Sequence, residues 1–271
     1  MSCRPFLRWA GSKRALLPQI REWFPPQWKC FHEPFLGSGA LYFSLAPCFA
    51  YLSDLNSRLT ITYGAVQRDL AKVLDSLRVY AAAYEKHAEA FYYHVRDSID
   101  PDTMEDHELA AWFIFMNKAG FNGLYRENSS GKYNVPAGKF ANPPVICDEE
   151  TLTACKAALG PATILNCDFR ETERRAAAGD FVYCDSPYAP TSDTADFTKY
   201  TKDDFDLADQ RALRDMAARL KAKGVHVLLS NADTSVVREL YAGWEMREIQ
   251  RSGGINSAVD KRGKVGELLI R

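Results

Sequence analysis

The feature that most constrains the fold is the regular alternation of apolar runs and helical patterns after residue 160. The apolar runs are of buried-strand type and lie at 162–166, 180–183, 225–230, 245–250 and 267–271. Helical patterns cover 206–223, with Gly224 expected as the C-cap, and 234–241. Such alternation predicts an α/β fold with a mainly parallel sheet.

The first part of the chain adds two strands to this sheet and then departs from the pattern. Residues 29–36 and 50–54 read as short strands, and a helix is expected over 40–45. Apolar residues at 58–116 recur at helical spacing, with a break at Pro101. The sequence therefore predicts that a mostly helical block, 59–162, is inserted into the α/β core.

Composition places the chain among ordinary soluble globular proteins. Of its 271 residues 46% are hydrophobic and 25% are charged. No apolar run approaches the roughly 20 residues that span a bilayer, and Met1–Pro5 does not begin a signal peptide. The seven cysteines are scattered and include no Cys-x-x-Cys pair. We expect reduced thiols in a cytoplasmic protein with no membrane partner, no disulfide framework and no metal site.

The charge is unevenly distributed although the formal net charge is only -1. The first thirty residues and the stretch 111–140 are basic, whereas 191–210 is acidic. Basic residues in the first two stretches are Arg4, Arg8, Lys13, Arg14, Arg21, Lys29, Lys118, Arg126, Lys132 and Lys139. These residues would either form a basic face that binds a polyanion or lie spread over the solvent-exposed surface.

Three segments have features of a nucleotide-type binding site. Glycines in Glu-Pro-Phe-Leu-Gly-Ser-Gly, 33–39, allow close approach of a ligand to a strand-to-helix turn, although such a turn can also serve only for packing. Asp54 ends the next strand, where an acid commonly binds ribose hydroxyls or, alternatively, caps a helix. Trp9 and Lys13 would cover an adenine ring and contact a carboxylate, or would be a buried anchor and a solvent lysine.

The segment that carries chemistry is Asp-Ser-Pro-Tyr at 185–188, directly after an apolar strand. In open α/β sheets, ligands bind beyond the carboxyl ends of the strands. A carboxylate, a backbone carbonyl and an aromatic ring at this position can hold a planar base that carries an amino group. Stacking of the base on the aromatic ring contributes roughly 1–3 kcal/mol per base.

Together these segments resemble the Dam-type, D12 class DNA adenine-N6 methyltransferases, which use S-adenosylmethionine. The resemblance rests on 9–13, 33–39, 53–56 and 185–188, which occur in the family's order over nearly the whole chain. It implies a Rossmann-like methyltransferase core with a mixed, mainly parallel sheet. That core would comprise 1–58 and 163–271, and 59–162 would be a helical DNA target-recognition domain with a hairpin near 117–140.

The resemblance also assigns roles to individual residues. The catalytic motif would be Asp185, Ser186, Pro187 and Tyr188, with the Asp185 carboxylate and the Ser186 carbonyl accepting the two N6 hydrogens of adenine. Contacts to S-adenosylmethionine would come from Trp9, Ala10, Gly11, Lys13, Pro34, Phe35, Gly37, Ser38, Gly39, Asp54, Asp168 and Asp185. The family usually has proline at position 186, so this chain lacks the restraint that a proline places on the backbone.

Residues 117–140 resemble the recognition hairpin of Dam-type enzymes that act on GATC. Asn122, Leu124 and Arg126 occupy the places of the family's Asn-Gly-Leu-x-Arg pattern, and Phe121 replaces a frequent tyrosine. Arg126 would pair with guanine, and Phe121 would fill the stack that a flipped adenine leaves. The expected DNA contacts are Arg8, Lys118, Phe121, Asn122, Leu124, Arg126, Asn134, Pro136 and Lys139, with Lys132 at a phosphate. Otherwise the segment is an ordinary surface loop.

Two other functions are compatible with these residues. Related motifs methylate RNA adenine or protein glutamine, and the change at Ser186 would also fit a DNA-binding homologue with a weak active site. The inserted domain and its Arg126 segment favour duplex DNA. We expect a monomer, because each N6 transfer needs only one active site.

Overall fold

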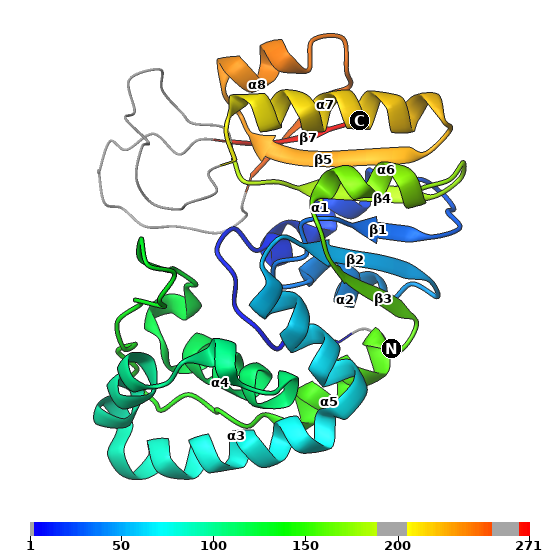
Figure 1. Cartoon of the computed structure of the whole chain (residues 1–271). Helices are drawn as coiled ribbons and strands as arrows, with labels where there is room; N and C mark the ends of the chain where they lie inside the picture. The colour runs from blue at the N-terminus through cyan, green and yellow to red at the C-terminus, as the bar shows by residue number, and fades with distance from the viewer. Residues whose placement is uncertain (1–2, 189–204, 251–265) are drawn as a thin grey trace. The chain divides into compact units, whose positions relative to one another are not determined.

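The computed structural model of the chain describes residues 3–188, 205–250 and 266–271. These residues contain a seven-stranded sheet in the order β3-β2-β1-β4-β5-β7-β6 (Figure 1). Its strands are β1 (Phe31–Glu33), β2 (Ala50–Asp54), β3 (Ala162–Asn166), β4 (Phe181–Asp185), β5 (His226–Ala232), β6 (Met246–Ile249) and β7 (Glu267–Ile270). Every strand expected from the sequence is present, with bounds that differ by a few residues at most.

The sheet is mixed and mostly parallel, as the sequence predicted. Strand β1 runs parallel to β2 and to β4, and β4 runs parallel to β5. Strand β7 is antiparallel to both β5 and β6. The parallel register places the carboxyl end of β4, at Asp185, opposite Ser230 of β5. These two residues lie where an α/β sheet binds its ligands.

The longer helices also follow the sequence patterns. The α-helices are α1 (Leu17–Arg21), α2 (Ala40–Leu45), α3 (Ser57–Ser98), α4 (Asp106–Ala119), α5 (Glu149–Leu159), α6 (Thr172–Arg175), α7 (Leu207–Ala222) and α8 (Ser235–Leu240). The 3-10 helices are η1 (Lys13–Leu16), η2 (Pro101–Thr103), η3 (Phe121–Gly123) and η4 (Phe169–Glu171). Among the described residues, none of the helices is long and apolar enough to cross a membrane.

The ends of α7 show how local sequence sets a helix boundary. The Asp206 carboxylate accepts a hydrogen bond from the Asp209 backbone N–H, and the Asp209 side chain accepts one from Asp206, which forms a capping box. The C-cap is Lys223, and Gly224 follows with a φ of 82°. The expected C-cap, Gly224, therefore lies one residue beyond the observed one, at the left-handed position that glycine tolerates best.

The polypeptide forms two compact units, each built from separate stretches of the sequence. Unit 1 comprises Met1–Ser12, Leu36–Cys48 and Ser53–Cys167, and unit 2 comprises Lys13–Phe35, Phe49–Leu52 and Asp168–Arg271. In unit 1, α3 packs on α4, and Phe115 of α4 contacts the rings of Tyr80, Phe91 and Tyr92. The α3 backbone leaves helical geometry at Asp69 and at Ala88.

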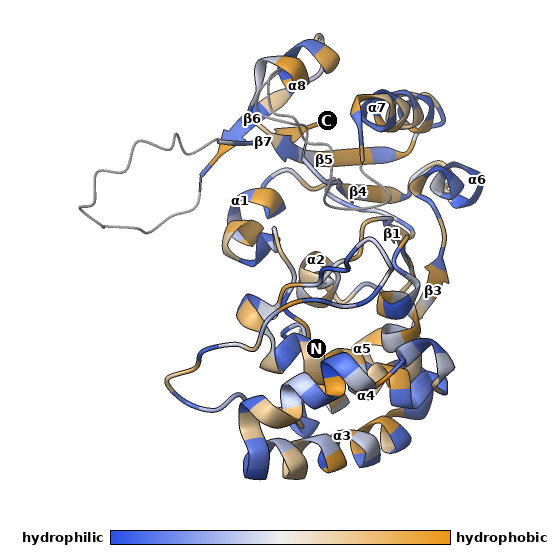
Figure 2. Ribbon diagram, turned by 60° about the vertical axis from the view of Figure 1, so that its left-hand side comes forward, coloured by the Kyte–Doolittle hydropathy of each residue, from blue (hydrophilic) through white to orange (hydrophobic). Residues whose placement is uncertain are grey.

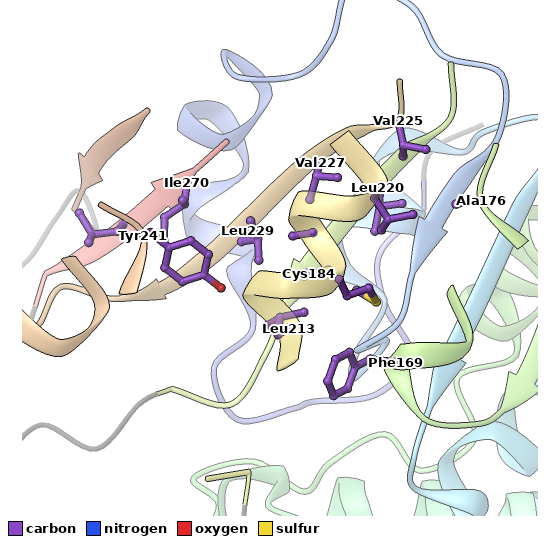
Figure 3. Close-up of a cluster of buried hydrophobic side chains, with 14 of the residues drawn as sticks. Phe169, Ala176, Cys184, Leu213, Leu220, Val225, Val227, Leu229, Tyr241 and Ile270 are labelled. Atoms are coloured by element: carbon purple, nitrogen blue, oxygen red, sulfur yellow. The ribbon is translucent and has the colours of Figure 1, made fainter. Parts of the chain in front are cut away.

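The core of unit 2 lies between α7 and the sheet. Leu213 and Leu220 of α7 face Val227 and Leu229 of β5 in one buried cluster (Figure 3). Hydropathy colouring gives β4 and β5 mostly hydrophobic residues and α7 both hydrophobic and hydrophilic sides (Figure 2). Burial of these apolar side chains fixes β4 and β5 side by side and so positions the residues at their carboxyl ends.

Candidate active site

The Asp185 carboxylate lies in a charged cluster at the end of β4, within unit 2. Lys13 Nζ is 2.7 Å from Asp185 Oδ1, and the Ser230 hydroxyl donates a 2.7 Å hydrogen bond to the same oxygen. Ser230 Oγ is also 3.1 Å from the Tyr183 hydroxyl. Lys13 and Ser230 thus converge on Oδ1, an arrangement that fixes the rotamer of the carboxylate.

Burial and the Lys13 charge shift the pKa of Asp185 in opposite directions. Desolvation raises the pKa of Asp185, whereas Lys13 and the Ser230 hydrogen bond lower it; Glu267, another carboxylate, raises it. Lys13 is only 3% exposed and lies 3.7 Å from Glu267. The alternative in which Lys13 is a solvent lysine is therefore wrong.

Tyr188 presents its ring beside this cluster. Lys13 Nζ donates a 2.7 Å hydrogen bond to the Tyr188 hydroxyl and lies 4.7 Å from the ring centroid. The side chain is 39% exposed, so part of the ring is accessible. Ser186 is buried, and its hydroxyl has no hydrogen-bond partner among the described residues.

Two buried amides hold the backbone of the same motif. Gln210 of α7 donates a 2.8 Å hydrogen bond from Nε2 to the Pro187 carbonyl. Asn231 of β5 in turn donates a 2.9 Å hydrogen bond to Gln210 Oε1. Both amides are buried, and each hydrogen bond reduces the freedom of the turn that follows β4.

In unit 1, Asp54 closes the glycine turn. Asp54 Oδ2 accepts a 3.0 Å hydrogen bond from the Gly37 backbone N–H, and Oδ1 accepts one of 3.0 Å from Asn56 N–H. Asn56, rather than Asp54, caps α3 by accepting from Leu59 N–H. Desolvation raises the pKa of Asp54, against these backbone hydrogen bonds, which lower it. Such a carboxylate is suited to binding ribose hydroxyls.

Trp9 packs directly against this turn. Gly37 has a φ of 47°, and a Cβ atom placed there would be 2.8 Å from Trp9 Cδ1. The indole also stacks on Phe113 and Tyr125, with ring centroids 6.3 and 5.9 Å away. Trp9 is partly buried and packs on the glycine turn, and its expected contact with the cofactor stays a prediction.

The other expected cofactor residues occupy varied positions. In unit 1, Ser38 Oγ donates a hydrogen bond of 3.3 Å to Ser12 Oγ. Ala10 is exposed, whereas Gly11 and Gly39 have positive φ values. In unit 2, Pro34 is buried, Phe35 stacks on Phe169 at 5.4 Å, and Asp168 caps η4 while pairing with Arg170.

The expected DNA-reading segment forms a short hairpin in unit 1. Glu127 and Tyr133 pair as an antiparallel bridge, and Asn134 N–H donates a 3.0 Å hydrogen bond to the Arg126 carbonyl. Arg126 Nε donates a 2.7 Å hydrogen bond to Asn134 Oδ1. Phe121 is 44% exposed, so its ring is available to another molecule.

Asn117 fixes the base of this segment. Its side chain accepts a 2.9 Å hydrogen bond from Arg8 N–H and donates bonds of 2.8 and 2.9 Å to the carbonyls of Arg8 and Gly123. Arg8, Pro136 and Lys139 are exposed, as a DNA contact requires. Lys118 is half-buried, and desolvation lowers its pKa.

The sequence missed several residues that organise these clusters. They are Ser230, Glu267, Gln210 and Asn231 in unit 2, and Tyr63, Asn117, Tyr125 and Arg58 in unit 1. Ser230 and Asn231 had a detectable signal, because they are polar residues at the end of an apolar strand. Within the described ranges, no group of three or more His, Cys, Asp or Glu side chains could hold a metal ion. The acidic stretch from Asp193 to Asp204 lies outside those ranges.

The fold and the two clusters define a methyltransferase of the α/β class. Residues 9–253 match the profile of the D12 class N6 adenine-specific DNA methyltransferases, and the chain belongs to this family. It is thus an adenine-specific DNA methyltransferase, as its sequence motifs predicted.

Named relatives align over almost their whole length. The type II methyltransferase M1.LlaDCHI of Lactococcus lactis subsp. cremoris is 36% identical over 100% of this chain and 95% of its own. The type II methyltransferase M.MjaIII of Methanocaldococcus jannaschii is 35% identical, with 100% and 99% covered. A DNA adenine methylase of Haemophilus influenzae is 35% identical, with 98% and 92% covered.

Proposed function

We propose that the protein transfers a methyl group from S-adenosylmethionine to adenine N6 at GATC sites in duplex DNA, with the target base flipped out of the helix. The observation that carries the chemistry is the partly buried Asp185 carboxylate, held through Oδ1 by Lys13 and Ser230. Residues 59–162 would act as the DNA target-recognition domain.

Asp185 and its neighbours suit the activation of an aromatic amine. The N6 lone pair is delocalised into the adenine ring, so N6 is a poor nucleophile. Asp185 would accept one N6 hydrogen and the Ser186 carbonyl the other, which favours tetrahedral nitrogen and offsets the positive charge that develops. Tyr188 would stack on the base. Lys13 favours the ionised form of Asp185, the form that accepts a hydrogen.

The residues of the glycine turn fit S-adenosylmethionine. When bound, this cofactor supplies an electrophilic methyl group on a sulfonium ion. The partly buried Asp54 carboxylate would hold its ribose hydroxyls, and the absence of a side chain at Gly37 permits close approach to the backbone. Trp9 would support the turn from the other side of Gly37.

The hairpin supports the GATC assignment. Arg126 is exposed and its guanidinium is oriented by Asn134, an arrangement suited to bidentate pairing with guanine. Extrusion of adenine leaves a gap in the base stack, and the exposed Phe121 ring would fill it. Arg8, Lys118, Lys132 and Lys139 would contact phosphates.

The test uses tritiated S-adenosylmethionine and two duplexes, one with GATC and one with that site scrambled. We expect label on GATC alone and at least a hundredfold lower rate in Asp185→Ala, in line with the roughly 10²–10³-fold effect of removing one transition-state hydrogen bond. Equal label on both duplexes would refute GATC specificity. Absence of label from both duplexes would refute GATC as the site. Label on plasmid DNA would then indicate another duplex site, and its absence there would favour RNA adenine or protein glutamine as substrate, or a weak homologue, for which Ser186→Pro is the next variant.

A further inference from the structure

Arg58 lies in the first turn of α3, where a positive charge is unfavourable. The helix dipole favours acids at this end, and the first turn of α3 contains none. The Arg58 side chain is nevertheless only 12% exposed. A largely buried cation in this position needs specific partners to offset both the unfavourable helix dipole and the loss of solvation.

Those partners come from two separate segments of unit 1. Arg58 donates three hydrogen bonds of 2.8–3.0 Å to the Asp102 carboxylate of η2. It also donates bonds of 2.8 Å to Glu127 Oε1 and 3.2 Å to the Tyr125 hydroxyl. The Tyr125 hydroxyl in turn donates to Glu127. One guanidinium therefore joins α3 and η2 to the hairpin.

The two hairpin partners of Arg58 flank Arg126. Side chains alternate along extended backbone, so Tyr125 and Glu127 point to one side and Arg126 to the other. The exposure of these residues agrees with this alternation, because Arg126 is exposed whereas Tyr125 and Glu127 are partly buried. Tyr125 is further fixed by stacking on Trp9 and on Phe113.

We infer that Arg58 is a specificity-positioning residue, which holds Tyr125 and Glu127 so that Arg126 is aimed at its base. The inference rests on the proposed function, in which Arg126 reads a base pair. Productive recognition geometry requires side chains to be held within about 0.5 Å. Asn134 orients the guanidinium of Arg126, while Arg58 fixes the backbone from which Arg126 projects.

A double-mutant cycle tests this inference. The preferred site of the wild type is first mapped on plasmid DNA, and kcat/KM is then measured on that site and on single-base-pair variants of it. We expect Arg58→Gln and Arg126→Ala each to reduce discrimination against the wrong base about tenfold. Because Arg58 acts through Arg126, the double variant should lose no more discrimination than Arg126→Ala alone.

A matched control is available on the same helix. Arg68 of α3 forms an exposed ion pair with Asp106 of α4 at 3.1 Å, away from the hairpin partners of Arg58, so Arg68→Gln should leave discrimination unchanged. Tyr125→Phe removes one hydroxyl but keeps the aromatic stack, and should reduce discrimination less than Arg58→Gln. This mild variant keeps the inference testable if Arg58→Gln does not fold.

The outcomes separate this inference from the proposed function. The positioning role would be overturned by wild-type discrimination in Arg58→Gln, or in Tyr125→Phe where Arg58→Gln does not fold. It would also be overturned by multiplicative losses in the double variant or by an equal loss in Arg68→Gln. A preferred site other than GATC would refute only the GATC assignment, because the cycle is then run on the site found. A wild type with no site preference would overturn both.

Discussion

The hydrogen bond from Ser230 to Asp185 connects a single residue to the pH dependence of the enzyme. This bond lowers the pKa of Asp185, whereas burial raises it. In the proposed reaction the ionised Asp185 accepts an N6 hydrogen and offsets the positive charge that develops, so kcat should fall at acid pH as this group becomes protonated. Ser230→Ala removes a stabilising partner of the ionised form and should move the acid limb to higher pH.

The measurement is kcat against pH for the wild type and Ser230→Ala. Ser235→Ala is the control, because Ser235 is an exposed residue at the start of α8. An acid limb that stays in place in Ser230→Ala would argue against Asp185 as the group that titrates.

His32 makes the stability of the fold depend on pH. It is buried on β1, where its Nε2 lies 3.0 Å from Asp180 Oδ2. Desolvation lowers the pKa of His32, although Asp180 raises it. Below the unfolded pKa of about 6.5, the unfolded state therefore binds a proton that the folded state does not. The free energy of unfolding should decrease as the pH is lowered through this range.

Urea unfolding at neutral and mildly acidic pH provides the test of this dependence. His32→Gln keeps a donor for Asp180 but cannot titrate, so its unfolding midpoint should change less with pH than that of the wild type. His226→Gln, at an exposed position, should behave as the wild type does. Equal pH dependence in all three proteins would refute the role of His32.

The sequence predicted site residues with their own chemical signature but not those that position them. Asp185 follows an apolar strand and precedes Ser-Pro-Tyr, so its place at the end of β4 could be inferred, while its chemical role stays a prediction. Gln210 lies in an ordinary amphipathic helix, and nothing nearby in the sequence indicates that it reaches the Pro187 carbonyl. Arg58 is similar, because its partners are 44 and 69 residues away along the chain. Long-range pairing of this kind requires the tertiary structure.

At the scale of elements, periodicity predicted the strands and the long helices well. Strands β2 and β3 have the expected bounds, because short apolar runs between turn residues leave little freedom. The short helix α1 was not predicted: it has five residues and a proline in its first turn, too few to show a helical period. Its position depends on packing, as the burial of Ile20 indicates.

The turn between β1 and α2 should tolerate no side chain at Gly37. Alanine there would combine a positive φ with a Cβ atom 2.8 Å from Trp9. We expect Gly37→Ala to lose about 1–3 kcal/mol of stability from backbone strain and to bind S-adenosylmethionine more weakly, because Trp9 and the turn must separate. Gly243 has a φ of 84° and no atom lies within 4 Å of an added Cβ. Gly243→Ala therefore introduces backbone strain without a steric clash and serves as the control.

Thermal unfolding and calorimetric titration with S-adenosylmethionine distinguish the two glycine variants. Both should melt earlier than the wild type, but only Gly37→Ala should lose affinity. Unchanged affinity in Gly37→Ala would show that the turn does not contact the cofactor.

At the scale of the whole molecule, neither unit is a continuous segment of the chain. The chain passes from one unit to the other after residues 12, 35, 48, 52 and 167. Residues 1–12 and 36–48 belong to unit 1 although most of that unit lies within 53–167. We therefore expect the folding of the helical region to depend on sequence upstream of it.

We predict that a fragment of residues 53–167 does not fold cooperatively by itself. It lacks Phe6, whose ring packs 5.0 Å from Tyr63, and Trp9, which stacks on Phe113 and Tyr125. Loss of these rings exposes apolar surface whose burial contributes about 25 cal/mol per Å². Far-UV circular dichroism in urea should give a broad, shallow transition for the fragment and a steep one for the full chain. A steep transition in the fragment would show that the inserted block is an autonomous domain and that the upstream segments only attach to it.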